Sequence, residues 1–406
     1  MAAVANTSGA WAFRRTLRRS AFGWRGTRLA ITRLKEALAE IRTVARRDPA
    51  RAAEGAVLLL EKVSPAVCNI DSSSGALGSA VQAVVAELVP IIAAAKVSDA
   101  VRDAWLRRLF DAIQDDDPPY IESLGDAWGE LCVTAERASR WVDELLPTVR
   151  RVIADGKAGR FGWFPGTGAC YSALFKAGRH DELLDLIAAD SPTIWQFQVW
   201  GARVYAARGE ADTAIAYMDR FRDRQPEAFA AFAEELLLGA GRRSEAYAQY
   251  AIAANQRNSY LATYRAIAKR YPEIEPDKLL DDLIASTPGE EGKWFATARA
   301  LKLFDRALAL ACRSPTEPKT LIRAASAEIA ARPQFACDAG LLALHWIALG
   351  YGYEITGADI NDAVKVIRQA GVQLGRPDEV EAMIDAIAVR CPGDLGEWMR
   401  RKHRGQ

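Results

Sequence analysis

Histidine is scarce in this sequence of 406 residues, and its scarcity excludes several classes of enzyme. The three histidines lie far apart, His180 in a turn, His345 in an apolar stretch and His403 in a basic tail. Metal sites and Ser–His–Asp centres need an imidazole close to clustered partner residues. We therefore predict a protein that is not an enzyme, with no catalytic residue, no metal site and no cofactor.

Paired cysteines and long apolar runs are also missing. The six cysteines contain no CxxC pair, so a dense secreted disulfide framework is excluded and reduced, mostly buried thiols are expected. The apolar stretch at 340–350 is far shorter than the roughly 20 residues that cross a membrane. The N-terminus has no apolar region followed by a small-residue cleavage site. These features predict a cytoplasmic protein with no transmembrane segment. The cysteines are Cys68, Cys132, Cys170, Cys312, Cys337 and Cys391.

Alternating β-branched residues, the signal of strands, are absent as well. The nearest approach is TIWQFQVW at 193–200, which runs directly into a helical pattern and is expected to be helix. Elsewhere the apolar residues recur at helical spacing, as Val101, Trp105, Leu109 and Ile113 do. The sequence therefore predicts an all-α fold.

What the sequence does contain is a recurring turn. Gly178, Gly209 and Gly241 lie 31 and 32 residues apart. Each glycine is followed after three residues by an acid or serine and after five by a small or apolar residue. Glycine adopts the left-handed conformation that ends a helix, and an acid at the start of the next helix caps it or complements its dipole. A fourth match has Lys302 in place of glycine.

This pattern resembles the second half of the tetratricopeptide repeat over roughly residues 165–315. It departs from that family because the early tryptophan and the mid-helix glycine of the first helix are missing. The resemblance implies a helix–turn–helix superhelix with a concave groove for peptides or partner proteins. Short stretches at 22–30, 71–78 and 351–360 are also similar to uncharacterised bacterial helical proteins, a likeness that implies no activity.

Two domains are predicted on either side of the glycine-rich stretch at 155–169. Residues 1–155 are expected to form an N-terminal helical domain with a basic arm, and residues 165–406 a repeat domain. We predict a scaffold or adaptor that binds a protein or peptide partner in the groove. The polar and aromatic residues expected to line this groove are Gln196, Gln198, Arg203, Asn258, Tyr260, Tyr264 and Arg265.

The first 35 residues carry a charge of +8 and no acid, while the rest of the chain carries −7. Arginines alternate there with Trp11, Phe13, Phe22 and Trp24. One interpretation is a strap docked on the protein's own chain. The alternatives are nucleic-acid binding, helped by the basic tail at 400–404, an anionic membrane surface, or an organellar transit peptide. The candidate phosphate-binding residues are Arg14, Arg15, Arg18, Arg19, Arg25 and Arg28.

Two further clusters have structural interpretations that we prefer to functional ones. Asp115–Asp117, followed by Asp126 and Glu130, could hold a cation, but EF-hand spacing is absent and a solvated loop is expected. The loop at 155–169, with Lys157 and Arg160, could bind an anion at the next helix N-terminus. It lacks the dinucleotide and P-loop signatures, so a hinge is expected, with Trp163 and Phe164 packing at the junction.

Overall fold

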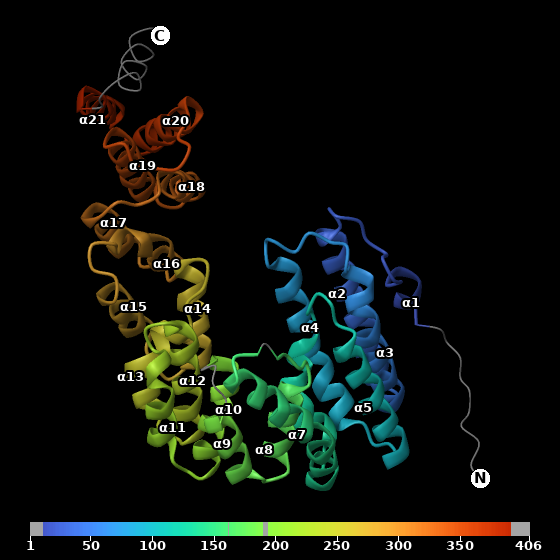
Figure 1. Cartoon of the computed structure of the whole chain (residues 1–406). Coiled ribbons are helices and arrows are strands. Elements are labelled where there is room, and N and C mark those ends of the chain that lie inside the picture. Colours follow the sequence, from blue (N-terminus) through green and yellow to red (C-terminus); the bar gives the residue numbers. More distant parts are fainter. Residues whose placement is uncertain (1–10, 161, 190–193, 391–406) are drawn as a thin grey trace. The chain divides into compact units, whose positions relative to one another are not determined.

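The chain is helical throughout the part that the structure describes. The computed structural model describes residues 11–160, 162–189 and 194–390, and no strand occurs among them. The all-α prediction is therefore confirmed. Contacts divide the chain into two compact units, Met1–Phe221 and Arg222–Gln406 (Figure 1).

The first unit begins with a bundle of long helices and continues with shorter helix pairs. Its elements are α1 (Phe13–Thr16), α2 (Thr27–Ala45), α3 (Pro49–Val67), α4 (Ala76–Ala94), α5 (Asp99–Gln114), η1 (Glu122–Ala127), α6 (Trp128–Cys132), α7 (Ala135–Lys157), α8 (Thr167–Lys176), α9 (His180–Ala189), α10 (Trp195–Ala207), α11 (Ala211–Met218) and η2 (Asp219–Phe221).

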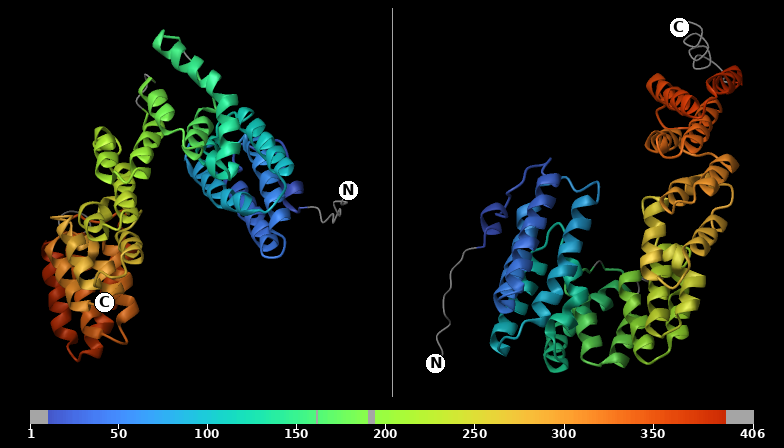
Figure 2. Two further views of the ribbon diagram at one scale, coloured as in Figure 1. Left: turned by 90° about the horizontal axis from the view of Figure 1, so that it is seen from below. Right: turned by 180° about the vertical axis from the view of Figure 1, so that it is seen from behind.

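The second unit consists of successive helix pairs, seen from behind in the right panel of Figure 2. Its elements are α12 (Pro226–Gly239), α13 (Arg243–Ala254), α14 (Tyr260–Arg270), α15 (Pro276–Ala285), η3 (Glu291–Trp294), α16 (Phe295–Ala300), α17 (Phe304–Arg313), α18 (Pro318–Glu328), α19 (Pro333–Ala348), α20 (Gly357–Gln373) and α21 (Pro377–Arg390).

The recurring turn predicted from the glycines is confirmed. At Gly178 the backbone φ is 74°, at Gly209 83° and at Gly241 74°, all in the left-handed region. Lys302 adopts φ 64° although it is not glycine, so the fourth match has the same backbone. After Gly241 the amide of Arg242 donates to the Leu237 carbonyl at 2.8 Å, which closes a Schellman motif.

After the turns at Gly209 and Lys302, the acid three positions on contributes charge rather than a cap. Asp212 and Asp305 lie in the first turns of α11 and α17, and neither helix has a side-chain cap. They stabilise the helix start through its dipole. The residue two positions further on is buried in every case, as Leu183, Ala214 and Ala307 illustrate, so it lies at the interface of the two paired helices.

Proline is common at the start of a helix, but not every proline of this chain begins one. Pro65 lies inside α3, near its end, and does not start a helix. The hydroxyl of Thr287 donates to carbonyls in the last turn of α15, and Pro288 lies in the turn that follows. Val101 is 41% exposed although Trp105, Leu109 and Ile113 of its predicted stripe are buried. Periodicity therefore identified α5 correctly, but the buried face is rotated toward Arg102 and Leu106.

The glycine-rich stretch at 155–169 lies within the first unit. The core of that unit is continuous across it, because buried residues of α7, such as Ile153, and of α8, such as Leu174, belong to one cluster. Phe164 packs on Phe110 with ring centroids 6.4 Å apart, whereas Trp163 is 52% exposed. The unit boundary that the contacts identify instead lies after Phe221.

Helix α4 is more apolar than the sequence analysis recognised. Among the described residues, it is the one helix long and apolar enough to cross a membrane by length and composition. It packs against both α2 and α3, and Glu87 on α4 forms an ion pair with Arg42 on α2. A second apolar stripe on α4 lines the cleft described below, so apolar side chains lie on more than one face of this helix.

Candidate functional site

A cleft of the first unit lies beside α4 and has a volume of about 770 Å³. Helix α10 forms one wall with a stripe that includes Gln196, Val199 and Arg203, at i, i+3 and i+7. Gln82 and Val89, seven residues apart on α4, line the same cleft. The carboxylates of Asp126 on η1 and Glu130 on α6 line it as well. The cleft therefore combines apolar walls with amide, guanidinium and carboxylate groups.

The charged residues of this cleft differ in their surroundings. Burial raises the pKa of Asp126 above its ordinary value, and the Arg203 guanidinium opposes that rise. Arg203 also lies over the Trp200 ring, 4.4 Å from its centroid. Glu130 is exposed on α6. A basic group entering the cleft would find two carboxylates, one of them partly desolvated.

Sequence analysis found part of this cleft. Gln196 and Arg203 line it, but Gln198 is buried and accepts a hydrogen bond from the Tyr217 hydroxyl at 2.6 Å, so it has a structural role. Asp126 and Glu130 were assigned to the acidic cluster instead. Helical periodicity on α10 was the available signal for Trp195 and Val199; the contribution of α4 depends on tertiary packing.

The remaining predicted groove residues lie in the second unit, on or just before α14. Tyr264 is 6% exposed and contributes to the core rather than to a surface. The Tyr260 hydroxyl donates to a Glu290 carboxylate oxygen at 2.8 Å, and its ring packs edge-on against Trp294. Asn258 and Arg265 are exposed. Of the four, only Asn258 and Arg265 present their side chains to solvent without a structural contact that we observe.

A second polar hollow lies in the second unit, between α18 and α20. Its volume is about 650 Å³, and Ile322 and Val366 form its apolar floor. Arg323, Asp362 and Lys365 line its rim. Sequence analysis missed this hollow because its residues are spread over two helices that only tertiary packing brings together.

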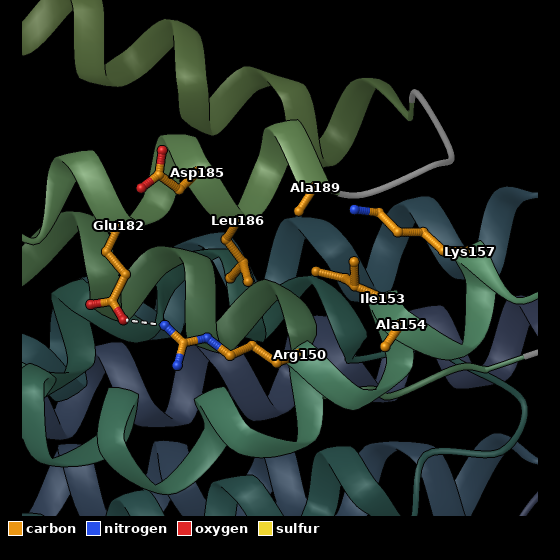
Figure 3. Close-up of a pocket in the computed structure, with 8 residues that line it drawn as sticks. All are labelled: Arg150, Ile153, Ala154, Lys157, Glu182, Asp185, Leu186 and Ala189. Atoms are coloured by element: carbon orange, nitrogen blue, oxygen red, sulfur yellow. Dashed lines mark hydrogen bonds and ion pairs between the residues drawn. The ribbon is translucent and has the colours of Figure 1, made fainter.

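A third hollow, of about 410 Å³, lies between α7 and α9 in the first unit (Figure 3). Arg150 and Glu182 form an ion pair of 2.9 Å at one end, while Lys157 approaches the opposite end. Ile153 and Leu186 form the floor between them. Lys157 of the predicted anion loop therefore faces this hollow. Arg160 instead forms an ion pair with Asp155 at 2.5 Å.

The basic N-terminal segment docks through its aromatic residues. Trp11, Phe13 and Phe22 are buried in the core of the first unit. The Ala12 amide donates to a Glu40 carboxylate oxygen at 2.8 Å, and the Ser20 amide donates to the Pro65 carbonyl at 2.8 Å. The six predicted arginines are exposed and form no ion pair with a described residue. Buried aromatic side chains and hydrogen bonds of the backbone amides therefore attach this segment to the chain, and ion pairs of its six arginines with described residues do not.

The acidic cluster is dispersed. Asp115 and Asp117 are exposed, and Asp116 accepts a hydrogen bond from the Ile121 amide at 2.6 Å. In the described ranges no three His, Cys, Asp or Glu side chains lie close enough to hold a metal ion. The Asp116 carboxylate therefore orders the loop between α5 and η1.

The two fully buried thiols of the first unit, Cys132 and Cys170, are poorly suited to nucleophilic chemistry. Burial raises the pKa of Cys132 to about 12 and that of Cys170 to about 12, so both stay protonated at neutral pH. Cys68 is half-buried and Cys312 exposed, and the cysteines at 68, 132, 170, 312 and 337 are free. Cys391, His403 and the basic tail lie outside the described residues. His180 stacks on Phe175 at 5.1 Å, and His345 packs edge-on against Trp346.

No protein-family model matches this chain, and no curated protein matches it significantly.

Proposed function

We propose that this chain is a non-enzymatic scaffold of tetratricopeptide-like helical hairpins that binds a protein or peptide segment. The cleft between α4, η1, α6 and α10 is the observation that carries this proposal, because it is concave and combines apolar side chains with amide, guanidinium and carboxylate groups. Two residues that the sequence predicts to line a groove, Gln196 and Arg203, line this cleft.

The pairing of helices supports the tetratricopeptide-like part of the proposal. First helices of successive hairpins contact one another, as α8 does with α10, α14 with α16 and α18 with α20. Second helices do the same, as α17 does with α19. Such stacking is how repeat proteins bury a continuous core and expose a binding surface. The hollow between α18 and α20 lies between two first helices, where this architecture presents a groove.

A site-specific photo-crosslinking experiment tests the proposal. A photoreactive residue is placed at Gln196, which is exposed in the cleft, and in a matched protein at Arg151, which is exposed on α7 and lines none of the three hollows. The proposal expects a discrete peptide to be crosslinked from the native lysate at position 196 and not at 151. An Arg203→Ala variant should then bind the identified peptide at least several-fold more weakly.

Equal labelling at both positions would contradict a dedicated cleft. So would an unchanged affinity of the Arg203→Ala variant for the identified peptide. Because Arg203 is exposed, this substitution is expected to leave the fold intact, which far-ultraviolet circular dichroism would verify.

A further inference from the structure

The exposed side of the segment that runs from α1 to the first turn of α2 is the strongest feature that the proposed scaffold function leaves unused. It consists of Arg14, Arg15, Arg18, Arg19, Arg25 and Arg28 together with Trp24 and Leu29, and we call it the basic surface. All eight side chains are exposed. It belongs to the first unit and does not depend on the proposed groove.

The charge of the basic surface is not neutralised by the part of the chain that the structure describes. Arginines elsewhere in the first unit pair with carboxylates; Arg107 with Glu144 and Arg179 with Asp143 are examples, each at 2.6 Å. Within residues 11–160, 162–189 and 194–390, the six arginines of the basic surface have no such carboxylate partner. An unpaired cluster of cations attracts a polyanion.

Two apolar side chains stand within this cluster. Trp24 is 68% exposed and Leu29 is 52% exposed, on either side of the first residue of α2. The backbone around them is fixed, because the Asp71 amide donates to the Trp24 carbonyl at 2.9 Å and the Thr27 hydroxyl donates to the Asp71 carbonyl at 3.2 Å. Arg25 and Arg28 lie next to them in the sequence. The protein thus holds a tryptophan and a leucine outward among arginines.

We propose that the basic surface docks on an anionic phospholipid membrane. Its arginines would contact lipid phosphates and carboxylates, while Trp24 and Leu29 would enter the interface between headgroups and acyl chains. Nucleic acid offers the same phosphates but rewards stacking on aromatic rings. Three of the four aromatic residues in the segment, Trp11, Phe13 and Phe22, are buried, and an exposed leucine adds nothing to base stacking. The combination of side chains that remains exposed therefore favours lipid.

Vesicle sedimentation of the full chain tests this inference. Vesicles of phosphatidylcholine alone are compared with vesicles containing about 30 mol% phosphatidylserine, at about 0.1 M and about 0.5 M salt. The proposal expects binding only to the anionic vesicles and loss of that binding at high salt. The Arg25→Gln/Arg28→Gln variant should bind at least tenfold more weakly, since each arginine near an anionic surface contributes about fivefold.

Matched variants separate position from composition. Arg46 and Arg47 are exposed at the opposite end of α2. The Arg46→Gln/Arg47→Gln variant therefore makes the same charge change about 27 Å along the helix from Arg28. Trp24→Ala/Leu29→Ser should weaken vesicle binding several-fold. Trp163→Ala/Leu349→Ser removes an equally exposed pair elsewhere and should leave binding unchanged.

Three outcomes would overturn the proposal. The first is the absence of binding to anionic vesicles. The second is a vesicle affinity that the Trp24→Ala/Leu29→Ser substitutions leave unchanged, or that the Arg25→Gln/Arg28→Gln and Arg46→Gln/Arg47→Gln variants lower by the same factor. The third is tighter binding to single-stranded or duplex oligonucleotides than to anionic vesicles at the same phosphate concentration, which would assign the basic surface to nucleic acid. Crosslinking at Gln196 is measured independently, so failure here leaves the scaffold proposal standing.

Discussion

Lys302 has the backbone conformation that glycine adopts in the equivalent turns of this chain. Its φ of 64° lies beside the 74° of Gly241, and the Leu303 amide donates to the Ala298 carbonyl as the Schellman motif requires. The left-handed conformation costs a residue with a Cβ roughly 1–2 kcal/mol. The surrounding hairpin of α16 and α17 imposes this conformation on a lysine whose side chain is exposed.

The Lys302→Gly variant should therefore be more stable than the natural chain. Glycine relieves the backbone strain, which stabilises the folded chain, but it also gives the unfolded chain more conformational entropy, which offsets part of that gain. We therefore expect the free energy of unfolding to rise by about 0.5 kcal/mol. Urea denaturation measures this difference. In the matched variant Gly241→Ala, an added Cβ would meet no heavy atom within 4 Å, so only strain acts and stability should fall by about 1 kcal/mol. A loss of stability in both variants would refute this account of the turn.

At the scale of single elements, α20 shows how a short sequence signal specifies a helix end. Thr356 and Asp359 have capping-box spacing, and the Thr356 amide donates to an Asp359 carboxylate oxygen at 2.8 Å. The backbone and hydroxyl of Thr356 both donate to this carboxylate and hold its pKa below the ordinary value of an aspartate. The charged form is therefore the one that stabilises the start of α20.

The Asp359→Ala variant should lose about 1 kcal/mol of stability at neutral pH. A carboxylate with a lowered pKa in the folded state contributes stability above its unfolded pKa, and that contribution disappears as pH falls through the folded pKa. The difference in the free energy of unfolding between the natural chain and the Asp359→Ala variant should therefore become smaller below about pH 4. Urea denaturation at several pH values tests this, with Asp362→Ala, an exposed change further along α20, as the control. A stability difference that does not change with pH would mean that the charge of the Asp359 carboxylate does not stabilise the start of α20.

At the scale of the whole molecule, contacts divide the chain into two compact units with their boundary after Phe221, whereas the sequence pattern predicts a domain boundary at 155–169. The core of the first unit runs continuously from the N-terminal segment to α10. The hairpin signature nevertheless occurs in both units, at Gly178 and Gly209 in the first and at Gly241 and Lys302 in the second. Hairpins that share this turn therefore do not all belong to the same compact unit.

Calorimetry of the full chain tests the independence of the two units. Leu60 on α3 and Leu321 on α18 are both completely buried. Truncating either to alanine should cost about 2–5 kcal/mol of local stability. We expect Leu60→Ala to lower only one unfolding transition and Leu321→Ala only the other. A single transition that both variants lower equally would show that the units unfold together.

Local patterns were sufficient to predict helices and turns, but they placed the buried face of α5 only in part, because Val101 is exposed. Apolar spacing and turn glycines act over a few residues, so they identified α5 and the left-handed turns at Gly178, Gly209 and Gly241. They also indicated Gln196 and Arg203 as surface residues of one helix. Tertiary packing decided the rest: which apolar side chains of the basic segment are buried, which face of α4 lines the cleft, and that Asp126 meets Arg203 there. These contacts join residues far apart in the chain, and the short-range spacing of side chains along one helix carries no information about which distant helix will cover it.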